Sequence, residues 1–144
     1  MRRILTVTAL VVGLTLLVVA VVPGVADAAK PVRTVTLSAT ATYNASSGNC
    51  SLSGMLTWFN WGGWGGYTEW YNVTDGCQYI PGSAKTFWFA RRGRQGYIFA
   101  QEMTDIPPGT YRLYGYLMKP NGRPVKDSST WSADCVCSPP SGGL

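Results

Sequence analysis

Histidine is absent from the 144-residue chain, and charged residues make up only 13% of it. Histidine is the usual general base beside a serine or cysteine nucleophile and also the commonest metal ligand. Carboxylates are the remaining catalytic candidates, but nothing in the spacing of Glu69 and Glu102, or of the aspartates, indicates the acid–base pair of a glycosidase. We therefore expect a protein that is not an enzyme and that uses no cofactor.

Long apolar runs are also missing, except for one at the start of the chain. Two arginines precede an uncharged run over residues 4–22, and the helix-ending pair Pro23-Gly24 follows. Ala26-Asp27-Ala28 then fits the A-x-A pattern that signal peptidase accepts. This predicts a secretory signal peptide over residues 1–29 and an extracellular, secreted protein. A retained anchor is the alternative, because about 20 apolar residues can span a bilayer. We expect contact with a membrane only if the segment is retained in this way.

The rest of the chain has the size of one ordinary domain. We expect a single domain over residues 30–137 and a flexible C-terminal tail over residues 138–144. From residue 30 onward, ten Lys and Arg stand against six Asp and Glu, which gives a net charge of +4. This weak positive charge suits an anionic partner but does not require one. No nucleic-acid-binding motif is present, so we do not expect the protein to bind nucleic acid. We expect it to be a monomer.

Cysteine is scarce, and its four positions predict disulfides in an exported chain. They are Cys50, Cys77, Cys135 and Cys137. A Cys135–Cys137 bridge would close a very tight ring, so we expect each of these two to pair with Cys50 or Cys77. A metal site is the weaker alternative, since the paired C-x-x-C spacing of structural zinc sites is lacking.

No segment has the pattern of an amphipathic helix, and apolar residues instead recur with period two. In residues 34–43, Val35, Leu37 and Tyr43 alternate with threonines and a serine, as in a half-buried strand. Turn residues separate most of the further candidates. The predicted strands are residues 34–43, 51–61, 67–73, 85–91, 96–103, 110–119 and 129–137.

Seven short strands in about 115 residues predict an all-β fold, a small antiparallel β-sandwich stabilised by disulfides. We expect immunoglobulin-like Greek-key connections. Residues 104–111, TDIPPGTY, resemble the corner before the penultimate strand of immunoglobulin-like and fibronectin-type domains. That resemblance places the Tyr111 hydroxyl to bond back to the corner. It concerns architecture and carries no function.

The most unusual segment is residues 58–71, in which an aromatic recurs every third residue among glycines. Exposed aromatic rings stack on the apolar faces of sugars, and their polar edges form hydrogen bonds. The predicted ligand-binding residues of this segment are Trp61, Trp64, Tyr67 and Trp70. In the alternative interpretation some of the rings, Trp58 above all, are core residues and the glycines only turn the chain.

Two further features could support binding. In residues 110–119, Tyr114 and Tyr116 alternate with leucines and form a second aromatic strip, exposed unless a neighbouring strand covers it. Arg91, Arg92 and Arg94 form a basic patch at a predicted hairpin tip. That tip is either a solvated turn or a contact for a phosphate-bearing polymer or a membrane surface.

These features predict a secreted, non-catalytic binding module that engages carbohydrate or a cell-envelope polymer through an aromatic, glycine-rich loop. The alternative is a secreted protein-interaction domain, such as an inhibitor or effector, that binds one extracellular protein. It would use the same aromatics and the basic tip, because Trp, Tyr and Arg dominate protein interfaces. A concave groove lined by rings favours sugar, and a flat apolar patch with a basic rim favours protein.

Overall fold

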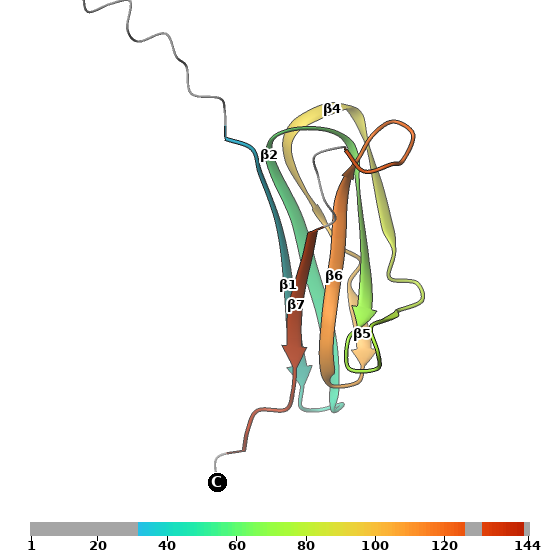
Figure 1. Ribbon diagram of the computed structural model, residues 1–144. Coiled ribbons are helices and arrows are strands. Elements are labelled where there is room, and N and C mark those ends of the chain that lie inside the picture. The colour runs from blue at the N-terminus through green and yellow to red at the C-terminus, as the bar shows by residue number, and fades with distance from the viewer. Residues whose placement is uncertain (1–31, 126–130, 143–144) are drawn as a thin grey trace, which may run out of the picture. The chain divides into compact units, whose positions relative to one another are not determined.

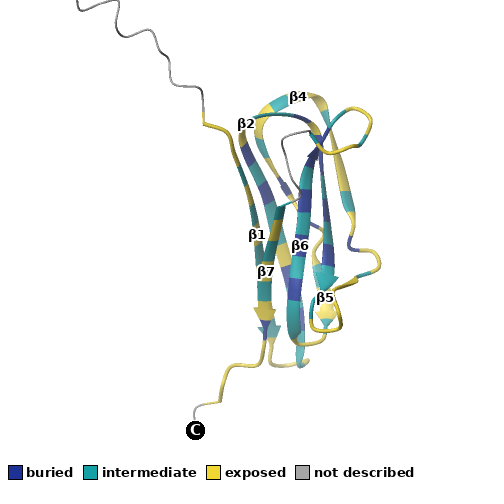
Figure 2. Ribbon diagram, in the orientation of Figure 1, coloured by how far each residue is buried: buried dark blue, intermediate teal, exposed yellow. Residues whose placement is uncertain are grey.

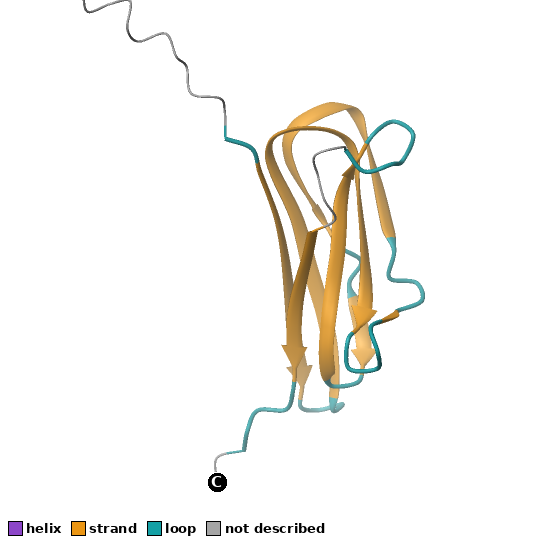
Figure 3. Ribbon diagram, in the orientation of Figure 1, coloured by secondary structure: helices purple, strands orange, loops and turns teal. Residues whose placement is uncertain are grey.

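The computed structural model describes residues 32–125 and 131–142, and it is all-β within them (Figures 1 and 3). The strands are β1 (Thr34–Asn44), β2 (Asn49–Asn72), β3 (Gln78–Tyr79), β4 (Lys85–Phe99), β5 (Met103–Ile106), β6 (Gly109–Met118) and β7 (Trp131–Cys137). None of these residues belongs to a helix that could cross a membrane. The predicted signal peptide lies outside the described residues. Residues 138–142 of the predicted C-terminal tail follow β7 without regular structure.

All strand pairs are antiparallel, and β2 is the centre of the sheet. The hydrogen-bonded order is β1-β2-β6-β7, and β3, β4 and β5 also pair with β2. The first half of β2 pairs with β1 over Asn49–Phe59, and its second half pairs with β6 over Gly65–Asn72. One strand therefore pairs with two groups of neighbours. The antiparallel pairing of all these strands confirms the prediction of an antiparallel all-β fold.

The core lies between these two groups. Leu52 from the first half of β2 and Trp70 from the second half belong to one buried cluster with Leu113 of β6. Leu56, Trp58 and Leu117 belong to a second cluster. Figure 2 shows the alternation of buried and half-buried residues along β6 that period two predicts.

Strand β2 is continuous where the sequence predicted two strands joined by a loop. Asn60 has a φ of 59°, and the register with β4 shifts between Phe59 and Gly63 and again between Gly63 and Gly65. Such bulges bend a strand without ending it, and glycine accommodates them easily. The aromatic, glycine-rich segment is therefore a bent strand, and the loop prediction is wrong.

Strand β4 bends in the same place, so Arg91, Arg92 and Arg94 do not form a hairpin tip. Residues 85–88 pair with the second half of β2, residues 95–99 pair with its first half, and Gly93 lies opposite Gly63. Figure 1 shows the two strands arching together at one end of the molecule. The predicted break between residues 91 and 96 is absent because the bent β2 remains a ladder partner for both parts of β4.

The corner before β6 forms as the resemblance implied. The Tyr111 hydroxyl donates a hydrogen bond to the Pro107 carbonyl oxygen. Tyr111 itself is 1% exposed, and burial raises the pKa of its hydroxyl. The bond therefore holds the short connection between β5 and β6 against the core.

One disulfide, Cys50–Cys137, joins the start of β2 to the end of β7 across a separation of 87 residues. Closing a loop of this length in the unfolded chain is worth roughly 4.6 kcal/mol on the chain-entropy model. The second predicted bridge is absent, because Cys77 and Cys135 are both free. Cys77 is exposed beside β3, and β2 and β6 lie between β3 and β7. Three strand spacings, roughly 14 Å, exceed the reach of a disulfide.

Candidate functional site: a tyrosine face on β2 and β6

Trp70, a predicted ligand-binding residue, is fully buried in the core. Its indole Nε1 donates to the Gln101 carbonyl at 2.9 Å, and its backbone N–H donates to the Ser83 hydroxyl at 3.0 Å. Because side chains alternate faces along a strand, a step of three residues places Tyr67 and Trp70 on opposite faces. Trp70 therefore cannot stack on a ligand, and this part of the predicted site is corrected.

The other two tryptophans predicted to bind a ligand differ from each other in exposure. Trp61 is half-buried against the second core cluster. The Trp131 ring contacts the Trp61 ring edge-on with centroids 6.2 Å apart, and the Arg33 guanidinium lies 5.4 Å above the Trp61 ring. Trp64 is 40% exposed at the bend of β2. Of the three predicted tryptophans, Trp64 is the most exposed.

Tyr67, Tyr114 and Tyr116, predicted from separate parts of the sequence, come together on the outer face of β2 and β6. Tyr67 lies opposite Tyr116 in the strand register, and their rings stack with centroids 5.0 Å apart. Tyr114 lies opposite Glu69, the next outward residue of β2. The second aromatic strip is thus half-buried beside β2 and continuous with Tyr67.

Two further tyrosines, which the sequence analysis did not select, complete the cluster. Tyr71 contacts Tyr114 edge-on at 5.0 Å and Tyr79 of β3 edge-on at 5.8 Å. Tyr67, Glu69 and Tyr71 alternate along β2, and that period-two pattern was the available signal for Tyr71. Tyr79 lies in a two-residue strand, too short to show any pattern.

Glu69 lies at the centre of this cluster and fixes two of its rings. The Tyr67 hydroxyl donates to one carboxylate oxygen at 2.7 Å, and the Tyr71 hydroxyl donates to the other at 2.9 Å. Burial and then the bond to Glu69 raise the pKa of Tyr67, while for Tyr71 the bond to Glu69 is the larger cause. Both hydroxyls therefore remain protonated donors with preset orientations.

An ion pair borders the cluster at β7. Arg112 donates from Nε and Nη2 to the two oxygens of Asp134, at 2.6 and 2.8 Å, and its guanidinium lies 6.0 Å from the centre of the Tyr114 ring. The arginine lowers the pKa of Asp134. We call the outward surface formed by these residues the tyrosine face. Its members are Tyr67, Glu69, Tyr71, Tyr79, Arg112, Tyr114, Tyr116 and Asp134.

The glycines near these aromatics make room for the protein's own side chains. A Cβ on Gly65 would lie 3.2 Å from the Trp88 ring, and one on Gly96 would lie 2.8 Å from the Trp58 ring. A Cβ on Gly62 would lie 2.2 Å from the Arg92 guanidinium. Small residues here permit close packing between β2 and β4.

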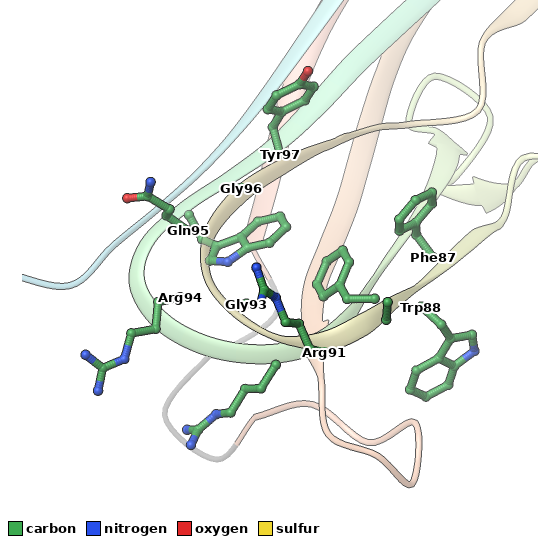
Figure 4. Close-up of a pocket in the computed structure, with 12 residues that line it drawn as sticks. Phe87, Trp88, Arg91, Gly93, Arg94, Gln95, Gly96 and Tyr97 are labelled. Atoms are coloured by element: carbon green, nitrogen blue, oxygen red, sulfur yellow. The ribbon is translucent and has the colours of Figure 1, made fainter.

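The predicted basic patch lies apart from the tyrosine face on the arch of β4. Arg91, Arg92 and Arg94 line a cleft together with Trp58 and exposed aromatic residues of β4 (Figure 4). Among the described residues, no group of three His, Cys, Asp or Glu side chains could hold a metal ion. The structure thus offers two surfaces for binding, the tyrosine face and the cleft.

Comparison of the chain with protein-family models, with curated proteins and with solved structures found no match.

Proposed function

We propose that this protein is a secreted, non-catalytic binding module and that its tyrosine face engages a carbohydrate or cell-envelope polymer. The observation that carries the proposal is the cluster of tyrosine rings fixed around Glu69 on one sheet face. Tyrosine rings stack on the C–H faces of sugars at little entropic cost, since they have few rotatable bonds. The ring-to-ring contacts also restrict their motion before any ligand arrives.

The polar groups of the face suit sugar hydroxyls. Tyrosine hydroxyls both donate and accept hydrogen bonds, Arg112 donates, and Glu69 and Asp134 accept. Along β2 the face extends from Tyr67 to Tyr71, roughly 13 Å at the usual rise of a strand. This is a length over which a polymer can make repeated contacts.

A protein partner is the competing proposal, and it predicts a different footprint. A protein interface would use the exposed aromatics of β4 and Arg91, Arg92 and Arg94 together with the tyrosines. A glycan needs the tyrosine face alone. The two proposals therefore differ in whether changes on β4 affect binding.

Glycan binding can be measured by depletion of the purified, disulfide-bonded protein onto a panel of insoluble polysaccharides and wall fragments. We expect Tyr114→Ala to weaken binding to whichever polymer retains the protein by about tenfold, the equivalent of 1.4 kcal/mol. The matched control is Tyr97→Ala, which removes an exposed tyrosine of β4. Equal effects of the two changes would show that the tyrosine face is not the binding site, and the absence of binding to every polymer would refute the proposal.

Export is part of the same proposal. The sequence of residues 1–29 supports it, and the Cys50–Cys137 disulfide is weakly consistent with it. Mass spectrometry of protein recovered from the medium of a secreting host should find Ala29 or Lys30 at the N-terminus. An intact Met1 in a membrane fraction would instead indicate a retained anchor.

We also infer that the architecture is a β-sandwich of the immunoglobulin-like kind, in which the two layers share β2 and β4. Support comes from Leu52 and Trp70, which lie in different halves of β2 yet belong to the same buried cluster. The bond from Tyr111 to Pro107 supports it further, because such a corner is common in these sandwiches.

A further inference from the structure

The arch of β4 encloses a cleft that the tyrosine face does not use. Residues 85–88 and 95–99 of β4 pair with different halves of β2, which leaves an open space between them of about 790 Å³. Clefts of this size hold ligands of several hundred daltons. Figure 4 shows Phe87 and Tyr97 on the two limbs of the arch.

Aromatic rings line the floor and sides of this cleft. Phe89 stacks on Trp58 with centroids 5.1 Å apart and contacts Phe87 at 5.7 Å. Phe87 and Tyr97 are 48% and 62% exposed. Phe87 lies opposite Gly66 in the strand register. A Cβ on Gly66 would contact Ile98 of the core, so the Phe87 ring lies at the edge of the core, where the core meets solvent. The cleft therefore offers apolar surface continuous with the core.

One polar atom in the cleft wall lacks a partner. Trp58 is 3% exposed, and its Nε1 has no hydrogen-bond acceptor among the described residues. Trp61 Nε1 and Thr68 Oγ1 share this property but do not line the cleft. Trp58 Nε1 has almost no solvent-accessible surface, so a ligand in the cleft meets the Trp58 ring and not its N–H.

Positive charge lies at one part of the rim of the same cleft. Arg91, Arg92 and Arg94 are exposed, and none forms an ion pair with a described residue. Figure 4 shows the Arg91 side chain directed across the inside of the arch, while that of Arg94 points away. An apolar cleft with unpaired guanidinium groups at its rim is complementary to a molecule with a hydrocarbon part and an anionic group.

We propose that the cleft binds a single molecule of an anionic amphiphile, an alkyl or acyl chain that carries a phosphate or carboxylate. The chain lies against Phe87 and Phe89. The anionic group accepts hydrogen bonds from the Arg91 guanidinium. This site is independent of the tyrosine face and of the carbohydrate proposal.

Isothermal titration calorimetry with decyl phosphate and decanoate, each below its micelle concentration, tests the proposal. We expect saturable binding of both. Inorganic phosphate, which lacks the chain, and decyltrimethylammonium, which has the opposite charge, should bind at least about tenfold more weakly. Equal binding of either of these two probes would overturn the proposal.

Variants locate the site. Arg91→Gln should weaken decyl phosphate binding about tenfold, since it removes a charge-assisted hydrogen bond to the anionic group. The matched control, Arg123→Gln, removes an exposed arginine outside the cleft and should have no effect. Equal losses in Arg91→Gln and Arg123→Gln would mean a general charge effect and refute the site.

Two further arms separate this proposal from others. Sedimentation with vesicles of phosphatidylcholine and phosphatidylglycerol tests a membrane surface, and binding to vesicles without binding to monomeric decyl phosphate would contradict a single-molecule site. Tyr114→Ala should leave decyl phosphate binding intact. The two proposals can therefore fail separately.

Discussion

Tyr67 on β2 and Tyr116 on β6 lie directly opposite each other and stack with ring centroids 5.0 Å apart. They are 49 positions apart in the sequence, and the long bent strand β2 brings them together. The same register places Glu69 opposite Tyr114 and Tyr71 opposite Arg112. The pairing of β2 with β6 thus creates the centre of the surface to which we assign ligand binding.

Replacing Glu69 tests how the face is organised. In Glu69→Gln we expect the pKa of Tyr67 and of Tyr71 to fall, because the carboxylate raises both. Alkaline titration of tyrosinate absorbance measures this, and Glu102→Gln, an exposed carboxylate elsewhere, is the control. Unchanged titration in Glu69→Gln would mean that the carboxylate does not hold these hydroxyls.

The same bonds imply a pH dependence of stability. Folding raises the pKa of Tyr67 and Tyr71, so their contribution is fully present below the unfolded value of about 10. It is lost as the pH rises through the folded values. Denaturant unfolding should therefore show stability falling above about pH 10, and falling less steeply in Glu69→Gln.

Thiol reactivity tests the disulfide assignment. We expect Cys77, which is exposed, to react readily with a thiol reagent in the native protein. Cys135 should react slowly, because burial raises the pKa of its thiol to about 11 and thiolate is the reactive form. Both should react after denaturation without reductant. If neither reacts in denaturant, the two cysteines are bridged and the assignment is wrong.

The corner residue Tyr111 should matter for stability and not for binding. Tyr111→Phe removes the hydroxyl that donates to Pro107, and we expect a loss of about 1 kcal/mol in the free energy of unfolding. Tyr97→Phe, at an exposed position, serves as control. Equal midpoints of denaturant unfolding for the two variants would show that the corner bond contributes nothing.

Strands with strict alternation and turn residues on both sides could be predicted from the sequence. The predicted range 34–43 compares with the observed Thr34–Asn44, and 110–119 with Gly109–Met118. The bends of β2 and β4 could not be predicted, because glycines suit a turn and a bulge equally well. Which of the two forms depends on whether a partner strand follows the bend, and that is a tertiary property.

The site was predicted in part for a related reason. Tyr114 and Tyr116 were found by their alternation with leucines, which identifies the face of a strand. Trp70 was misassigned because a three-residue repeat was interpreted as one surface, although the strand period is two. Applied to residues 67–71, the period of two selects Tyr67, Glu69 and Tyr71, which form one side of the observed face.

Nuclear magnetic resonance mapping tests the central claim most directly. The ¹⁵N-labelled protein is titrated with a soluble oligosaccharide of whichever polymer retains it, and the shifts of backbone amides are followed. The tyrosine face predicts that the largest shifts fall on residues 67–71, 79 and 112–116. Shifts confined to residues 87–97 of the β4 arch, or spread evenly over the chain, would contradict it.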